Sequence, residues 1–277
     1  MGGVIALSRP LNCAMSAVGV GIGGVVAVGA AAWGPLSLPL ALAAAAAAAF
    51  TAGGNALNDV YDVETDRVNH PERPLPSGRL TTRGARTFAA AAFLAAAGIA
   101  AFVNPWCAAL VGINAVVMIG YEERFKSRGA SGNVVIAYLV GSLFLFAGLA
   151  TFGGDGTALL RSAVLAALAS ATTLGREITK DIEDIAGDVD RRTLPQRIGA
   201  RRAGLVASLA FGAGVAMSAV PWAVQILGLA YALLVLPADG MFIYAALHSS
   251  AQPARAQRVA KYAMIVALAA FLAGGVR

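Results

Sequence analysis

Nine apolar stretches, each long enough to cross a lipid bilayer, constrain the fold more than any other feature of this sequence. A membrane helix needs about 20 mainly apolar residues. Only 13% of the residues are charged, whereas soluble domains average about 25%. We therefore predict an all-α integral membrane protein whose nine transmembrane helices form a bundle around a central cavity. The stretches cover residues 7–32, 36–60, 84–103, 105–121, 133–152, 157–180, 200–219, 221–247 and 257–276.

The loops between these stretches alternate between short, nearly uncharged linkers and longer, basic ones. Positive charge concentrates in cytoplasmic loops of membrane proteins. We therefore expect a multi-pass protein of the cell membrane whose N-terminus, basic loops and active site face the cytoplasm. The net charge of +6 belongs to these loops, so topology explains it better than nucleic-acid binding does. The basic linkers are residues 67–83, 122–132, 185–199 and 251–258.

Polar residues gather at the end of the second apolar stretch and again at the end of the sixth. The spacing Asp59, Asp62, Asp66 recurs 122 positions later, and each set occupies one face of a helix at about 100° per residue. A single set would fit a solvated acidic helix end, but two copies with identical spacing disfavour that interpretation. Clustered carboxylates repel one another, and a cation with oxygen ligands, such as Mg²⁺, relieves the repulsion.

We predict two Mg²⁺ ions between the two acidic motifs, which would bridge the oxygens of a diphosphate. Asp59 and Asn55 are weaker ligand candidates. The predicted metal ligands are Asn58, Asp62, Asp66, Asp181, Asp184 and Asp188.

The repeated motif also predicts internal symmetry. Arg73-Pro-Leu-Pro in one loop is echoed by Arg192-Thr-Leu-Pro in another. Two helices that carry the motifs and run in the same direction fit parallel repeats. We predict a single domain over residues 1–277, with repeats at about 1–132 and 133–250, each of four helices, and a ninth helix after them.

Several charged residues outside the acidic motifs have two possible roles. Lys126 and Arg128 are either part of an ordinary basic loop or ligands of phosphate oxygens. Arg9 is either an anchor at the membrane surface or part of the site. Asp239 falls in the middle of an apolar stretch, where a carboxylate makes either an internal polar contact or a contact with an acceptor substrate.

Taken together, these motifs resemble those of the UbiA superfamily of intramembrane prenyltransferases. The resemblance rests on N-D-x-x-D-x-x-x-D from Asn58, the stretch 67–78, and R-E-I-T-K-D-I-E-D-I-A-G-D from Arg176. It implies Mg²⁺-dependent transfer of a prenyl group from an isoprenyl diphosphate in the membrane. The Gly132-Asn133 step and the stretch 69–79 resemble the archaeal branch, which implies geranylgeranyl diphosphate as donor and geranylgeranylglyceryl phosphate as acceptor.

The motifs and the resemblance together predict the roles of the site residues. Asp62, Asp184 and Lys126 are predicted to be catalytic. The proton of the acceptor hydroxyl would pass to released diphosphate or to a carboxylate. The predicted substrate-binding residues are Arg9, Asn12, Asn55, Arg67, Arg73, Tyr121, Lys126, Arg128, Asn133 and Lys180.

Three other functions compete with this prediction. The same family includes enzymes with aromatic or chlorophyllide acceptors. A secondary transporter also uses repeats and membrane carboxylates, but its site normally lies near the middle of the bilayer. A CDP-alcohol phosphotransferase would need a glycine-containing pattern after the first pair of aspartates, and Asp62 is followed by Val63.

Overall fold

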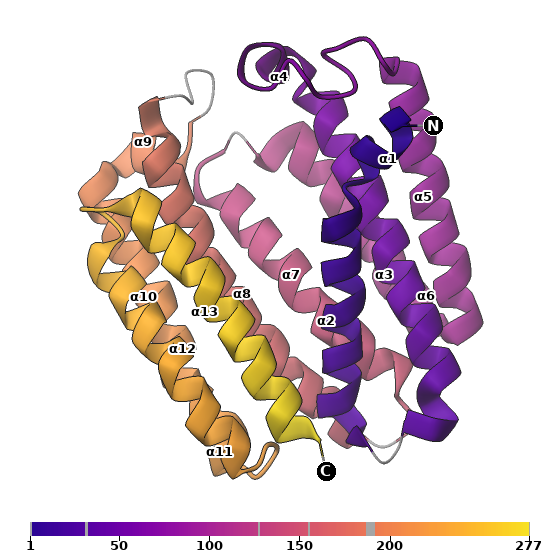
Figure 1. Cartoon of the computed structure of the whole chain (residues 1–277), viewed down its shortest axis with the longest axis vertical. Coiled ribbons are helices and arrows are strands. Elements are labelled where there is room, and N and C mark those ends of the chain that lie inside the picture. The colour runs from indigo at the N-terminus through magenta and orange to yellow at the C-terminus, as the bar shows by residue number, and fades with distance from the viewer. Residues whose placement is uncertain (1, 31–32, 127, 155, 187–191, 277) are drawn as a thin grey trace. The chain divides into compact units, whose positions relative to one another are not determined.

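The computed structural model describes residues 2–30, 33–126, 128–154, 156–186 and 192–276. All its regular elements are helical, and Figure 1 shows them in chain order. The α-helices of the first half are α1 (Gly2–Ser8), α2 (Pro10–Val28), α3 (Trp33–Tyr61), α4 (Val63–Asn69), α5 (Thr82–Val103) and α6 (Pro105–Gly120). A π-helix, η2 (Tyr121–Phe125), follows. The remaining helices are α7 (Ala130–Ala150), α8 (Gly156–Glu183), the 3₁₀ turn η3 (Asp184–Ala186), α9 (Leu194–Ile198), α10 (Ala200–Ser218), α11 (Val220–Ala223), α12 (Leu229–His248) and α13 (Pro253–Gly275).

Nine helical segments within the described residues are long and apolar enough to cross a membrane. They correspond one to one with the nine predicted stretches, so the predicted class of all-α membrane protein is confirmed. The segments are Pro10–Val28, Gly34–Tyr61, Thr82–Val103, Pro105–Phe125, Ala130–Ala150, Gly156–Glu183, Ala200–Ala223, Leu229–His248 and Pro253–Gly275.

The first and eighth stretches differ from their predicted bounds because of proline and backbone turns. The first divides at Arg9, whose φ is +50°, since the ring of Pro10 cannot continue the preceding helix. The expected break at Pro221 lies instead inside a helical segment, because proline is tolerated in the first turn of α11. The chain leaves that segment at Gln225, where φ is +57°.

The helices form two compact units. Unit 1 consists of Met1–Gly21 and Leu36–Glu123, and unit 2 consists of Ile22–Pro35 and Arg124–Arg277. The internal repeat and the single domain remain predictions.

Unit 1 is held together by close contacts of α3 with α5 and α6. Gly53 of α3 lies so near Phe93 of α5 that an added Cβ would be 3.1 Å from the ring. The rings of Phe50 and Phe93 stack at 5.1 Å in a tilted arrangement. Gly54 meets Met118 of α6. Small residues permit this close approach of membrane helices, and it fixes the end of α3 that carries the first acidic motif.

Unit 2 is organised around α8, which packs against α7, α10 and α13. An added Cβ at Gly141 of α7 would lie 2.7 Å from the carbonyl oxygen of Ala166. Gly175 packs in the same way on Phe211 of α10. Since α7 and α10 both approach α8 closely, the end of α8 with the second acidic motif is held in place.

Candidate functional site

The first acidic motif spans the junction between α3 and α4. Asp62 stands at this junction with φ −92° and ψ 6°, as the N-cap of α4. Its side chain makes no capping hydrogen bond, but acidic residues in the first turn, such as Asp66, match the helix dipole. The chain therefore bends within the motif, and Asp66 comes from α4 rather than from a continued α3.

Two arginines neutralise the buried carboxylates of this motif. Asp59 is 2% exposed and Asp66 is 4% exposed. Arg9 forms an ion pair with Asp59. Arg73 lies 2.6 Å from Asp66 and 3.8 Å from Asp59. Buried charges need such partners, so Arg9 and Arg73, which sequence analysis assigned to substrate, both contact carboxylates in this structure.

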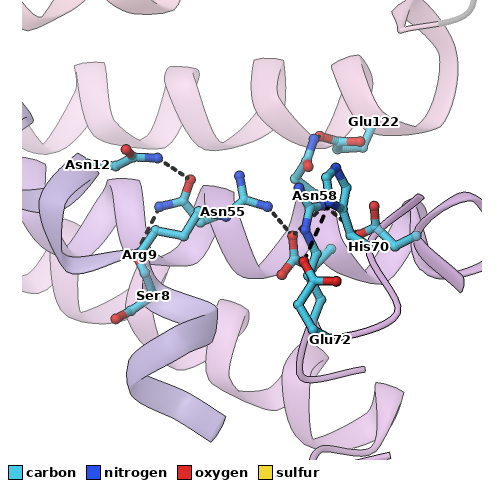
Figure 2. A network of polar contacts seen from close by, with 11 residues as sticks. Ser8, Arg9, Asn12, Asn55, Asn58, His70, Glu72 and Glu122 are labelled. Carbon is cyan, nitrogen blue, oxygen red and sulfur yellow. Dashed lines mark hydrogen bonds and ion pairs between the residues drawn. The ribbon is translucent and has the colours of Figure 1, made fainter. Parts of the chain in front are cut away.

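The amide side chains of α3 connect it to its neighbours, as Figure 2 shows. Asn55 donates from Nδ2 to the carbonyl oxygen of Ser8 at 2.9 Å. Asn12 donates from Nδ2 to Oδ1 of Asn55 at 3.5 Å. Asn58 donates from Nδ2 to Oε1 of Glu122 at 2.9 Å, a contact that fixes which side of the amide faces Glu122.

Glu122 is not among the site residues predicted from the sequence. Its side chain is buried, 6% exposed, on the π-helix η2. Such helices are rare and often occur at functional sites. Tyr121, a predicted substrate residue, belongs to the same turn. The signal was present in the sequence, because two glutamates directly follow an apolar stretch there, but only the fold brings Glu122 to Asn58.

The second acidic motif begins in the last turns of α8. Asp181 accepts a hydrogen bond from Nδ2 of Asn133, on α7, at 3.0 Å. Lys180 lies 3.6 Å from Asp184, and both side chains are nearly half exposed. Asp184 starts the turn η3. Asp188 lies outside the described residues, so its predicted role as a ligand stays a prediction.

The remaining predicted substrate residues lie in the short helix α4 and in the loop after η2. Arg67 pairs with Glu64 at 2.8 Å on the surface of unit 1. In unit 2, the backbone of Arg128 forms a bridge with that of Arg192. This bridge ties the loop that contains Lys126 and Arg128 to the loop before α9.

The donor set of the two motifs suits Mg²⁺, because its side chains offer carboxylate and amide oxygens. Among the described residues, no three His, Cys, Asp or Glu side chains lie close enough together to hold an ion. Asp62 and Asp66 belong to unit 1, whereas Asp181 and Asp184 belong to unit 2. The predicted two-ion site therefore stays a prediction.

Asp239, the carboxylate in the middle of α12, has an internal partner. Ser218 of α10 donates from Oγ to Oδ2 of Asp239 at 2.7 Å. The hydroxyl of Tyr231 donates to the carbonyl oxygen of Ser218, also at 2.7 Å. Of the two roles considered for Asp239, the internal polar contact is the one this structure contains.

Among the described residues, nine helical segments that are long and apolar enough to cross a membrane define a multi-pass membrane protein, in which one acidic motif lies at the end of α3 and the other at the end of α8. The chain belongs to the UbiA prenyltransferase family, whose model matches residues 18–273. It is therefore an enzyme, a prenyltransferase, and the family resemblance noted in its sequence is confirmed.

Individual relatives are similar over almost the whole chain. The digeranylgeranylglyceryl phosphate synthase of Methanopyrus kandleri is 39% identical over 272 residues, which cover 96% of this chain and 97% of the relative. A solved structure described as that of a digeranylgeranylglyceryl phosphate synthase in membranes superposes with a TM-score of 0.85 at 29% identity, covering 99% of this chain and 98% of that one. A UbiA homologue from Archaeoglobus fulgidus, bound to GPP and Mg²⁺, shares the fold at 18% identity, with a TM-score of 0.63 over 99% of this chain and 98% of that one.

Proposed function

We propose that this enzyme transfers a geranylgeranyl group from geranylgeranyl diphosphate to the free hydroxyl of geranylgeranylglyceryl phosphate. The reaction belongs to the synthesis of archaeal-type ether lipids. The observation that carries the proposal is the similarity, at 39% identity over 96% of the chain, to a relative named digeranylgeranylglyceryl phosphate synthase.

The reaction exchanges one C–O bond for another. The bond between C1 of the prenyl chain and the diphosphate oxygen breaks, and its electron pair leaves with diphosphate. The acceptor oxygen forms a new bond to C1 and loses its proton. An unactivated alcohol is a weak nucleophile, so stabilising the leaving group contributes most of the catalysis.

The acidic motifs supply oxygen ligands for this step. Asn58, Asp62 and Asp66 from one motif and Asp181, Asp184 and Asp188 from the other would hold two Mg²⁺ ions. When bound, Mg²⁺ neutralises diphosphate charge as the C–O bond breaks.

Cationic side chains of the protein would add to this effect. Lys126 and Lys180 are proposed to contact diphosphate oxygens as charge develops on them, with Arg67 nearby in the sequence of the first motif. The apolar side chains of the membrane helices keep water from the allylic cation. Asn133 fixes Asp181 through the amide contact described above, so the carboxylate is oriented before the substrate arrives.

A transfer assay in detergent or nanodiscs tests the proposal directly. Purified enzyme receives geranylgeranyl diphosphate with one of four acceptors: the phosphorylated glycerol ether, its dephosphorylated form, 4-hydroxybenzoate or chlorophyllide. We expect Mg²⁺-dependent release of diphosphate and preferential prenylation of the phosphorylated ether. Preferential prenylation of 4-hydroxybenzoate or chlorophyllide would assign another acceptor branch, and absence of diphosphate release with every acceptor would contradict prenyl transfer.

The site is proposed to lie at the cytoplasmic side of the membrane. Both substrates have lipid tails and would reach it from within the membrane. The basic loops next to the acidic motifs support this orientation. Labelling of a cysteine introduced at Arg79, an exposed residue of the first basic loop, by an impermeant reagent tests it. Labelling only after the membrane is opened is expected, and labelling of intact cells would reverse the orientation.

A further inference from the structure

Arg176 of α8 has a distinctive environment that none of the roles above uses. Its side chain is 24% exposed, and its Nη1 donates a hydrogen bond of 2.6 Å to Oε1 of Glu177. Its Nε is buried and has no hydrogen-bond partner among the described residues. A buried guanidinium nitrogen without an acceptor is unfavourable, so this side chain is built to meet a further oxygen atom.

Helix geometry places Arg176 on the same side of α8 as Lys180. The two residues are separated by about 40° around the helix axis and by about 6 Å along it. Ile178, which packs with the core residues Ala203 and Ala207 of α10, lies about 200° from Arg176. Arg176 therefore faces away from the α8–α10 contact and shares its face with a residue of the second acidic motif.

The contact with Glu177 holds the guanidinium in a fixed orientation. Adjacent residues of a helix do not face each other, so Arg176 bends its side chain toward Glu177 and the fork is held by one nitrogen. On the edge of the guanidinium that includes Nε, the Nε–H group still lacks an acceptor among the described residues. A planar fork of this kind matches two oxygens of a phosphate group, and lysine does not reproduce that geometry.

The position of Arg176 favours the acceptor's phosphate over the donor's diphosphate. The diphosphate is proposed to contact Lys180 near the end of α8, next to Asp184, a proposed Mg²⁺ ligand at the start of η3. Arg176 lies one turn before Lys180, on the side toward which the prenyl chain, and with it C1 and the attacking hydroxyl, would extend from the diphosphate into the membrane. Glycerol has three carbons, so a phosphate on one of them stays within a few bonds of the hydroxyl on the next.

The two arginines of unit 1 nearest the first acidic motif, Arg9 and Arg73, are already engaged with carboxylates. Arg9 and Arg73 pair with the buried Asp59 and Asp66, and both contacts involve carboxylates of the motif itself. Arg176 also has an acidic partner, but it retains one buried nitrogen without an acceptor. This difference marks Arg176, rather than Arg9 or Arg73, as the phosphate ligand.

We infer that Arg176 binds the phosphate of the acceptor and makes the enzyme selective for the phosphorylated glycerol ether. The inference rests on the proposed function. It concerns recognition of one substrate, so it predicts an effect that depends on the acceptor and leaves the donor unaffected.

The test compares wild type, Arg176→Gln and Arg176→Lys with the phosphorylated and the dephosphorylated glycerol ether. For Arg176→Gln we expect kcat/KM to fall about 10- to 100-fold with the phosphorylated ether, since a hydrogen bond to a charged group is lost. The value for the dephosphorylated ether and the KM for geranylgeranyl diphosphate stay at wild-type levels. For Arg176→Lys, which keeps the charge but not the planar fork, we expect kcat/KM with the phosphorylated ether to lie between the values of wild type and Arg176→Gln. Arg202→Ala, which removes an exposed arginine at the start of α10, is the matched control and should behave like wild type with both acceptors.

The outcomes separate this inference from the proposed function. If wild type prefers the phosphorylated ether and both Arg176 variants keep that preference, the inference is wrong and the proposed function stands. An equal loss with both acceptors, or a raised KM for the donor, also overturns the inference. If wild type prenylates neither glycerol ether, the proposed function fails and the assignment of Arg176 fails with it. If Arg176→Gln does not fold, Arg176→Lys decides by the same comparison.

Discussion

Replacing Asp59 by asparagine tests whether this carboxylate stabilises the fold, in contrast to the carboxylates that are proposed to bind metal. Asp59 is 2% exposed and contacts both Arg9 and Arg73. With both arginines as partners, it is expected to hold α1, α3 and the loop after α4 together. We predict that Asp59→Asn destabilises the protein but leaves its Mg²⁺ requirement unchanged.

The expected magnitude follows from the burial of the three side chains. Removing one partner of a buried ion pair costs about 3–5 kcal/mol. Arg9 and Arg73 are 32% and 28% exposed, so water compensates part of their lost pairing, and Arg73 keeps Asp66. We therefore expect about 3 kcal/mol, at the lower end of that range, which corresponds to a decrease in Tm of about 6 °C or more.

The assay is thermal unfolding in detergent, combined with a Mg²⁺ titration of prenyl transfer. Asp62→Asn is the matched control, since the Asp62 side chain makes no capping hydrogen bond and α4 should persist without the carboxylate. We expect Asp62→Asn to lose activity with a smaller change in Tm. The reasoning is refuted if Asp59→Asn keeps the wild-type Tm and instead needs several-fold more Mg²⁺ for half-maximal activity.

Three further predictions concern the site and the helix packing. Asp62→Ala and Asp184→Ala should each reduce transfer more than tenfold, a loss above about 1.4 kcal/mol, while the protein still elutes as a folded species in size-exclusion chromatography; activity above a tenth of wild type in either variant would count against the two-ion site. Lys126→Ala should lower turnover about tenfold or more without changing the Mg²⁺ requirement, and a variant that matches wild type across donor concentrations would make Lys126 a topological anchor only. Gly141→Val should abolish the yield of folded protein, because even a Cβ would lie 2.7 Å from a carbonyl oxygen of α8, whereas Gly112→Ala on α6, with nothing within 4 Å, should express normally.

The membrane helices were predictable because apolar length is a local property of the sequence. Each of the nine predicted stretches contains most of one helical segment. The errors occur at proline and at isolated backbone turns. Pro10 and Pro221 have the same local restriction, but one begins a helix after a turn at Arg9 and the other lies in the first turn of α11. Both prolines lie in the first turn of a helix, where proline is tolerated; the two cases differ in the preceding backbone, since Arg9 has a positive φ whereas Ala219 keeps helical dihedral angles between α10 and α11.

The acidic motifs were also predictable, but the partners of their side chains were not. The spacing of aspartates on a helix face follows from the helix period. The pairing of Arg9 with Asp59 joins residues 50 positions apart, and that of Asn58 with Glu122 joins residues 64 positions apart. Such contacts depend on how α2, α3 and η2 pack, which one sequence does not specify locally. Positive charge near the motif was therefore assigned to substrate, although part of it neutralises carboxylates.

The polar residues at the helix ends fall into two groups, those that are buried and paired within the protein and those that are partly exposed. A carboxylate that is almost fully buried needs a cation from the protein, and Asp59 and Asp66 have one. Asp184 is nearly half exposed, and its Oδ2 lies 3.6 Å from Nζ of Lys180. This distance is longer than a normal hydrogen bond, so another ligand can compete with Lys180 for the carboxylate. Among the residues of α8 and η3, the side chains best suited to bind substrate or metal are thus the ones that the fold leaves partly exposed or incompletely satisfied. Asp184 meets the first condition and the buried Nε of Arg176 meets the second. Arg176 lies near the end of α8 and Asp184 starts η3 directly after it, so this segment is expected to control both the binding of diphosphate and the choice of acceptor.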